Sequence, residues 1–285
     1  MICDFRRILD LRNSLRLLFR RITPLYWAVG VVRYVRFRQE VRRADQKYWS
    51  SDEYLELPPP NLRFRVHKAL DAASYTANGV SITNDIVKIL ESNRIDISNS
   101  RILDFASGPG RVAGFLSQRF PNAKFFATDI DVEAISWAQV RFNDEIKFSS
   151  NEVLPPTHFD SQSFDLIYTV SLFTHLDEQL QFQWLKELQR ILRPNGYLVA
   201  TVHGELARST CTSSELEAIR TKGILFRTDR IGLLKLDGLP DFYQTTFHSE
   251  NYVRNRWADY FEIVDYQVGG IQNHQDAVVL KRRSA

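Results

Sequence analysis

The chain has 285 residues, of which 44% are hydrophobic and 12% aromatic, so it is long enough to bury a sizeable core. Its two cysteines, Cys3 and Cys211, offer neither a disulfide framework nor the paired spacing of a zinc site, and this favours a reducing, cytoplasmic compartment. The formal net charge of +3 is unevenly distributed, because residues 1–50 hold 12 Lys and Arg against 4 Asp and Glu.

Residues 1–57 are predicted to form a basic, amphipathic helical extension. Between Phe5 and Arg43 apolar residues alternate with arginines at helical spacing, with an interruption near Pro24. The longest uncharged run, Ile22 to Val32, is too short to cross a bilayer. Residues 1–50 could contact a membrane surface peripherally, form a dimer contact or pack on the chain's own domain. A nucleic-acid partner is disfavoured, because such an arm would not need so many large apolar residues.

Residues 58–285 are predicted to form one α/β domain. After helices within residues 61–92, strands are expected at 101–105, 123–130, 146–149, 164–170 and 197–202, with helices between them and a turn at 193–196. This alternation is typical of a Rossmann-like, doubly wound and mostly parallel sheet. Residues 204–247 lack clear periodicity and are predicted to be a substrate-side insertion. A helix at 250–260 and strands at 261–268 and 277–281 follow, the last closing the sheet in antiparallel orientation.

The segment LDFASGPGRVAG, residues 103–114, carries the strongest chemical signal. Gly108 and Gly110 lie between a predicted strand and a predicted helix, where the backbone can approach a nucleotide-like ligand. The glycines with Asp129 also fit the dinucleotide fingerprint, so an NAD(P)-dependent oxidoreductase is an alternative. Asp104 favours a cofactor with a cationic end, because a carboxylate at this strand end would repel a pyrophosphate.

Together with FDLIYTVSLFTHLDE (164–178) and RPNGYLVATVHG (193–204), this segment resembles the motifs of class I S-adenosylmethionine (SAM)-dependent methyltransferases. The resemblance covers about residues 62–282, and one departure is Ala106, where the family usually has glycine. It implies SAM as the cofactor. It also implies roles for individual residues. The methionine-side loop would consist of Asp104, Ala106, Gly108 and Gly110, and Asp129 would accept hydrogen bonds from the ribose. Ile130 and Asn151 would lie beside the adenine, and the methyl-transfer cleft would be lined by Ser171, Phe173 and His175.

Methyl transfer chiefly requires that the reacting atoms are aligned, so few catalytic side chains are expected. A hydroxyl acceptor would profit from a base, for which His203, directly after the fifth strand, is preferred over His175, with His274 and Asp276 as further candidates. No metal is predicted, because the fourth strand ends without the carboxylate of metal-dependent catechol-type enzymes.

The expected acceptor is a hydroxyl on a small molecule, a sugar or a lipid-linked glycan. The basic residues of 204–247 could meet an anionic acceptor or form a solvated surface: Arg208, Arg220, Lys222, Arg227 and Arg230. A protein that binds SAM without catalysis is the remaining alternative.

Overall fold

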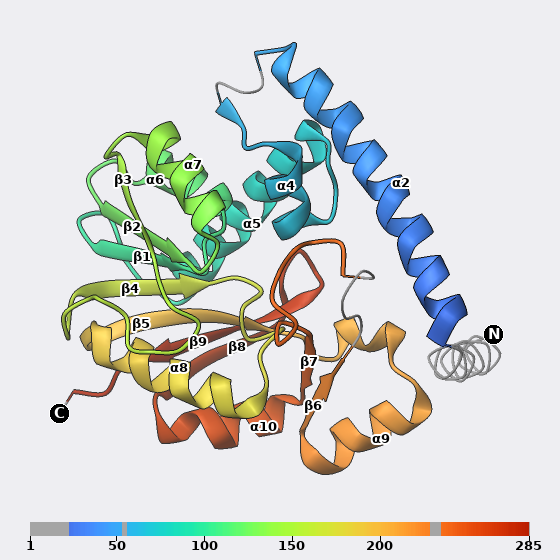
Figure 1. Ribbon diagram of the computed structural model, residues 1–285. Coiled ribbons are helices and arrows are strands. Elements are labelled where there is room, and N and C mark those ends of the chain that lie inside the picture. Colours follow the sequence, from blue (N-terminus) through green and yellow to red (C-terminus); the bar gives the residue numbers. More distant parts are fainter. Residues whose placement is uncertain (1–22, 53–55, 229–234, 285) are drawn as a thin grey trace.

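A seven-stranded sheet in the order β3-β2-β1-β4-β5-β9-β8 forms the centre of the protein (Figure 1). This computed structural model describes residues 23–52, 56–228 and 235–284. The parallel strands are β1 (Arg101–Phe105), β2 (Lys124–Asp129), β3 (Ile146–Ser150), β4 (Phe164–Thr169) and β5 (Leu192–Val202). β9 (Gln275–Lys281) is antiparallel both to β5 and to β8 (Glu262–Ile271). The predicted Rossmann-like sheet with a closing antiparallel strand is therefore confirmed.

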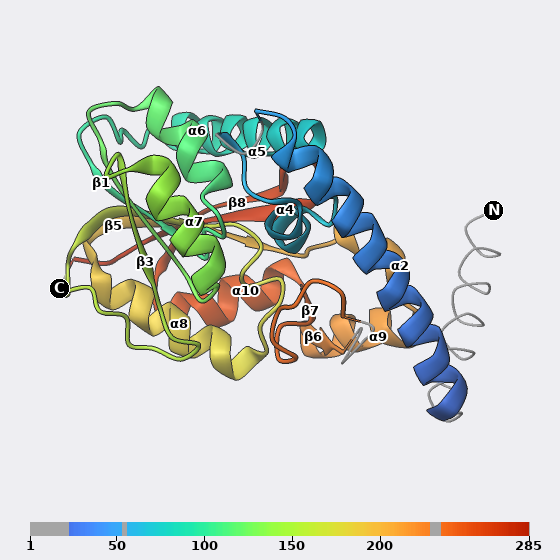
Figure 2. The same cartoon turned by 45° about the horizontal axis from the view of Figure 1, so that its top comes forward.

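Helices cover both faces of the sheet (Figure 2). One face carries α5 (Ala72–Ser92), α6 (Arg111–Arg119) and α7 (Val132–Phe142), and the other carries α8 (Glu178–Ile191), α10 (Glu250–Arg256) and the short η3 (Trp257–Asp259). Side chains alternate along each strand to serve the two layers. In β1, Ile102 packs in the α5–α6–α7 layer and Leu103 in the α8–α10 layer, and both are fully buried.

The segment between β5 and α10 is more ordered than its sequence suggests. It contains η1 (Leu206–Thr210), α9 (Ser213–Lys222) and two antiparallel strands, β6 (Ile224–Arg227) and β7 (Thr245–His248). α9 begins with a capping box of Thr212 and Glu215 and ends at Gly223, which has φ +80°. These capping residues are signals of a helix in the sequence, but the segment lacks the apolar periodicity from which a helix is usually predicted.

The turn at residues 193–196 also differs from the prediction. It does not separate α8 from β5, because β5 already pairs with β4 at Leu192 and the turn residues form an irregularity inside the strand. Asn195 takes φ +62°, and its N–H donates to the carbonyl of Arg282 just beyond β9. The irregularity is therefore held by this hydrogen bond on the β9 side and by the pairing with β4 on the other side.

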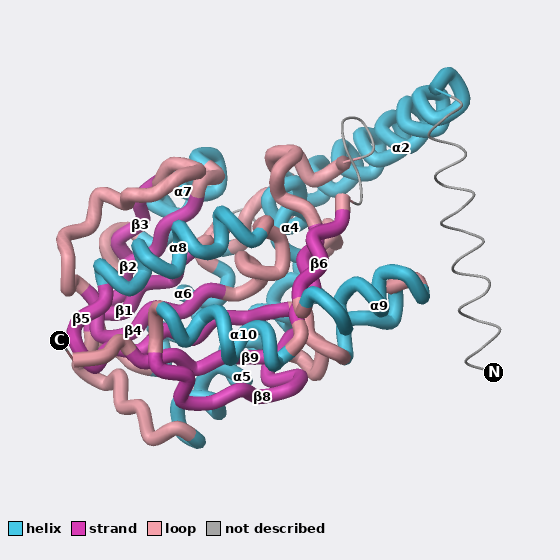
Figure 3. The backbone as a smooth tube through the Cα atoms, turned by 90° about the horizontal axis from the view of Figure 1, so that it is seen from below, coloured by secondary structure: helices cyan, strands magenta, loops and turns pink. Residues whose placement is uncertain are grey.

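Two helices precede the sheet domain. α2 (Thr23–Trp49) lies along α4 (Pro60–His67), and the rings of Phe37 and Phe64 meet at 4.5 Å. The end of α2 that begins at Thr23 stands out from the body of the protein (Figure 3). The part of the predicted extension before Thr23 lies outside the described residues. Pro24, near which a break is expected, is the second residue of α2, and the domain boundary at residue 57 stays a prediction. Among the described helices, none is long and apolar enough to cross a membrane.

Candidate functional site

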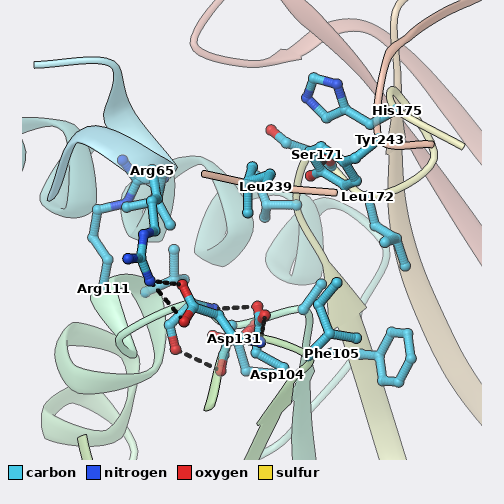
Figure 4. Close-up of a pocket in the computed structure, with 18 of the residues that line it drawn as sticks. Arg65, Asp104, Phe105, Arg111, Asp131, Ser171, Leu172, His175, Leu239 and Tyr243 are labelled. Atoms are coloured by element: carbon cyan, nitrogen blue, oxygen red, sulfur yellow. Dashed lines mark hydrogen bonds and ion pairs between the residues drawn. The ribbon is translucent and has the colours of Figure 1, made fainter. Parts of the chain in front are cut away.

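A cavity of about 450 Å³ opens where the carboxyl ends of β1, β2 and β4 meet. This is the edge at which open α/β sheets bind ligands, and the volume suits a small molecule. Most of the predicted site residues line it, on the strand ends and loops shown in Figure 4. They are Asp104, Ala106, Gly108, Asp129, Ile130, Asn151, Ser171 and His175. Gly110 and His203 do not.

The loop after β1 needs left-handed backbone at three positions. Ala106 has φ +65°, Gly108 +54° and Gly110 +78°. For Ala106 this conformation costs about 1–2 kcal/mol, which explains why glycine is usual there. A Cβ added to Gly108 would lie 2.6 Å from Val66 Cγ1, so α4 packs directly on the loop. Gly110 is the N-cap of α6, and a Cβ there would lie 2.6 Å from a ring atom of Phe148. It serves packing rather than the cavity surface.

Asp104 is a buried carboxyl group at the cavity floor. The hydroxyl of Tyr168 donates to its Oδ2 at 2.9 Å. Burial, with a smaller contribution from the nearby carboxylate of Asp129, raises the pKa of Asp104 to about 7 despite that hydrogen bond. A cation bound beside Asp104 would favour its ionised form. The charge environment therefore fits an ammonium group.

Arg111 supplies the opposite charge. It lines the cavity, and its Nε and Nη1 are enclosed without a hydrogen-bond partner among the described residues. The same holds for Oδ1 of Asn78 and Oε1 of Gln275, which also line the cavity. Buried polar atoms are normally paired, so this group calls for a polar ligand. A zwitterionic amino acid moiety, such as that of SAM, would place its ammonium at Asp104 and its carboxylate at Arg111.

Asp129 suits a ribose. Its two carboxylate oxygens accept hydrogen bonds from the N–H groups of Gly108 and Asp131 at 2.7 and 2.8 Å, while burial raises its pKa. A carboxylate has about four acceptor positions, so capacity remains for two hydroxyls. Asn151 lies beside it: its N–H donates to the Asp129 carbonyl at 3.1 Å, and its Oδ1 accepts from Thr128 at 3.0 Å. This bond orients the Asn151 amide at the cavity wall.

Helix α4 completes the wall on the Asp129 side. Arg65 Nη1 forms an ion pair with Asp131 at 2.7 Å, while Asp131 also caps α7 by accepting from the N–H of Ala134. Lys68, just after α4, pairs with Asp237 at 2.6 Å. No role for α4 or for Asn78 was predicted, because helical periodicity does not say where a helix docks. Arg111 was within reach of prediction, since it directly follows Gly110 in the quoted motif.

His175 and His203 occupy different positions. His175 lines the cavity, stacks on Tyr243 at 4.3 Å, and donates from Nδ1 to the carbonyl of Gln244. That bond leaves the basic lone pair of the neutral ring on Nε2. His203 lies behind it, 6.0 Å away between ring centroids. Burial, with the neighbouring His175 and His274 rings, lowers the pKa of His203 to about 3, which makes it a weak base. The geometry does not support the preference for His203.

Three other expectations need correction. Phe173 does not line the cleft; it is fully buried in the core, with its ring 4.9 Å from that of Trp257. Asp276 is structural, because it accepts hydrogen bonds from the Tyr266 hydroxyl and the Gly269 N–H. The basic residues of the insertion are absent from the cavity lining within the described part of the chain. Arg208 donates to the His248 carbonyl, Arg220 pairs with Glu217 and Arg227 lies 3.6 Å from Glu215, whereas Arg230 lies outside the described residues.

A cluster of three or more metal-ligating His, Cys, Asp or Glu side chains is not found within the ranges that the structure describes. The absence of a metal cofactor stays a prediction.

Comparison with known proteins agrees with this geometry. Residues 102–196 match the family model described as a methyltransferase domain. A phthiotriol/phenolphthiotriol dimycocerosates methyltransferase of Mycobacterium ulcerans is 29% identical over 114 residues, 39% of this chain and 40% of that protein. A fatty-acid O-methyltransferase of Mycolicibacterium smegmatis is 28% identical over 109 residues, 37% of this chain and 38% of that protein. The chain thus spans about two fifths of the length of the curated relatives it matches.

A solved structure shares the fold. A SAM-dependent methyltransferase of Methanosarcina mazei aligns with a TM-score of 0.51 at 18% identity, over 69% of this chain and 98% of that one. The family match over residues 102–196 and this shared fold agree with the predicted class I SAM-dependent methyltransferase domain. The class uses SAM as its cofactor, and the Asp104–Arg111 arrangement fits that molecule. The sheet topology argues against the NAD(P)-dependent alternative, because antiparallel β9 follows β5 in the sheet where a dinucleotide fold has another parallel strand.

The role of Arg111 can be tested with two ligands. Arg111→Leu should weaken SAM binding by about 1.5–3 kcal/mol, or roughly 10- to 150-fold, because the carboxylate loses a charge-assisted partner. 5′-Methylthioadenosine lacks the amino acid moiety and should bind wild type and variant nearly equally. Calorimetric titration measures both affinities, and Arg119→Leu at the exposed end of α6 is the matched control. Equal losses for the two ligands would show that Arg111 supports the fold instead.

The raised pKa of Asp104 predicts pH-dependent cofactor binding. Above pH 7 the carboxyl group is already ionised, whereas below pH 7 binding of the ammonium group must displace a proton. SAM affinity should therefore fall by about tenfold from pH 8 to pH 6. Asp104→Asn should bind SAM weakly at pH 8 and lose most of that dependence. The assignment fails if both proteins show the same slope in titrations across this range.

Proposed function

We propose that the protein transfers the methyl group of SAM to a hydroxyl of an apolar small molecule. The observation that carries this proposal is the position of His175, which lines the same cavity as Asp104 and whose Nδ1 is hydrogen-bonded to the Gln244 carbonyl, so that Nε2 is the basic atom of its neutral ring. A hydroxyl acceptor must lose its proton as it attacks, and a neutral imidazole is suited to take it.

The residues around the cavity would divide the work of the reaction. SAM supplies an electrophilic methyl group on its sulfonium. Asp104 and Arg111 would hold the zwitterionic end, and Asp129 would hold the ribose, so that the reactive part is oriented by residues outside the chemistry. As the O–C bond to the methyl group forms and the C–S bond breaks, Nε2 of His175 would take the proton that the attacking hydroxyl loses. Two further hydrogen bonds hold the surroundings of the His175 ring. The Gln244 N–H donates to the His175 carbonyl at 3.0 Å, and the Tyr243 hydroxyl, whose ring stacks on His175, donates to the Ser171 carbonyl at 2.9 Å.

The cavity walls favour an apolar acceptor over a sugar. The wall near His175 is built from large apolar side chains contributed by the loop after β4, by α8 and by the segment before β7. These are Leu172, Leu176, Trp184, Leu239 and Phe242. Such a wall excludes water and rewards burial of hydrocarbon at about 25 cal/mol per Å². The names of the two curated relatives, which refer to dimycocerosates and to a fatty acid, support the same choice.

The activity can be tested directly. We expect calorimetric titration to detect SAM binding and no binding of NADP. Incubation with SAM labelled in its methyl group should then transfer label to a pool of apolar alcohols and phenols, with little transfer to free sugars. Binding of SAM without label transfer to any pool would support a non-catalytic role and contradict the proposal.

The base is assigned by a pair of variants. His175→Ala should lower turnover by about 10²- to 10⁴-fold while SAM affinity changes little, as expected when proton transfer loses its acceptor. His203→Ala is the comparison, because this ring is adjacent but outside the cavity lining. We expect its turnover to stay within a few-fold of wild type. The reverse pattern would restore His203, and small effects in both would mean that alignment alone drives the reaction.

A further inference from the structure

The first part of α2 exposes an apolar surface that the described residues do not cover. From Trp27 to Val35, every residue except Gly30 is solvent-exposed, and this segment is called here the apolar arm. Trp27 is 58% exposed, Val29 and Val32 each 55%. Large apolar side chains at such exposure, side by side, are unusual on a soluble surface and mark an interaction site.

The apolar side chains of the arm cover more than half of its circumference. At about 100° per residue, Trp27, Val31, Val35, Val32 and Val29 follow one another over an arc of about 200°, and Arg33 lies in the remaining arc. A partner helix packed on one side would cover one stripe of this arc and leave the rest in water. A lipid surface that takes up this broad side would cover the whole arc. This pattern favours a lipid surface over a second copy of the chain.

Charge points to the same occupant. Arg33 and Arg36 lie in and beside the arm, and six basic residues of α2 stand against two acidic ones. The basic residues are Arg33, Arg36, Arg38, Arg42, Arg43 and Lys47; the acidic ones are Glu40 and Asp45. Lipid headgroups attract such a cluster, while Trp27 and Tyr34 are side chains of the type that prefers the boundary between headgroups and hydrocarbon.

The arm is accessible and too short to span. A groove separates its Ala28, Val29 and Val32 from Phe64 and Leu236 on the body of the protein, and this end of α2 projects outward (Figure 3). Trp27 to Val35 rises by only about 12 Å, against a hydrocarbon core of about 30 Å. Its dimensions fit insertion into one leaflet at the interface.

We propose that the apolar arm of α2 docks on an anionic lipid surface. The inference does not depend on methyl transfer, because it rests on the exposure and charge of α2 alone. It also places the cavity close to that surface, since α2 packs on α4 and α4 lines the cavity.

The test is co-sedimentation of the full chain with vesicles. The protein should bind vesicles of phosphatidylglycerol and phosphatidylcholine at low salt, bind less at high salt, and bind weakly to phosphatidylcholine alone. The triple variant Val29→Ser, Val31→Ser, Val32→Ser should bind at least about tenfold more weakly. Val140→Ser, on α7 and 84% exposed, is the matched control and should bind like wild type. The double variant Arg33→Gln, Arg36→Gln should reduce the salt-dependent part of vesicle binding.

Two measurements keep the outcome clear. Circular dichroism and SAM titration should be unchanged in all variants, so a loss of vesicle binding is separable from loss of the fold or of the proposed function. The proposal is overturned if wild type stays in the supernatant, or if the triple variant sediments like wild type. It is also overturned if light scattering shows a dimer that the triple variant abolishes, since the arm would then belong to a second copy.

Discussion

Two carboxyl groups at neighbouring strand ends determine the electrostatics of the site. β1 and β2 are parallel and in contact, so Asp104 and Asp129 come to the same edge of the sheet, where Asp104 is buried, Asp129 is half-buried, and the Asp129 carboxylate opposes ionisation of Asp104. Such a pair is costly unless a ligand compensates it. Other polar groups of the cavity lie where they can compensate these carboxyl groups. Arg111 of α6 is enclosed nearby, and its Nε and Nη1 have no hydrogen-bond partner among the described residues. The backbone N–H groups of Gly108 and Asp131 donate to Asp129.

The parallel half of the sheet could be predicted because its signals are local. The strand at 101–105 has the predicted bounds and α7 lies between β2 and β3 as predicted, since short apolar runs alternate with capped amphipathic segments. The segment 204–247 could not be predicted in the same way. β6 is short and half-exposed, and its partner β7 lies many residues later, so its pairing depends on contacts between distant segments.

The candidate site was predictable where topology alone places a residue. Asp104, Asp129 and Ser171 follow parallel strands, and the ends of parallel strands meet. Topology does not say which way a side chain turns after the strand. His203 directly follows β5, but its backbone forms a bridge to Phe247 that directs the ring into the cluster behind His175. Residues from helices outside the repeating βα pattern, such as Arg65 and Asn78, carry no positional signal of this kind.

Helix α4 belongs to two surfaces at once. On one side Phe64 packs against Phe37 of α2, and on the other Val66 lies over Gly108 while Arg65 pairs with Asp131. The eight residues of α4 are therefore a mechanical link between the long first helix and the cofactor loop. Thermodynamic linkage is reciprocal: if binding of a partner at α2 alters affinity in the cavity by some factor, occupation of the cavity alters affinity for that partner by the same factor. Any coupling between the two ends of this link therefore acts in both directions.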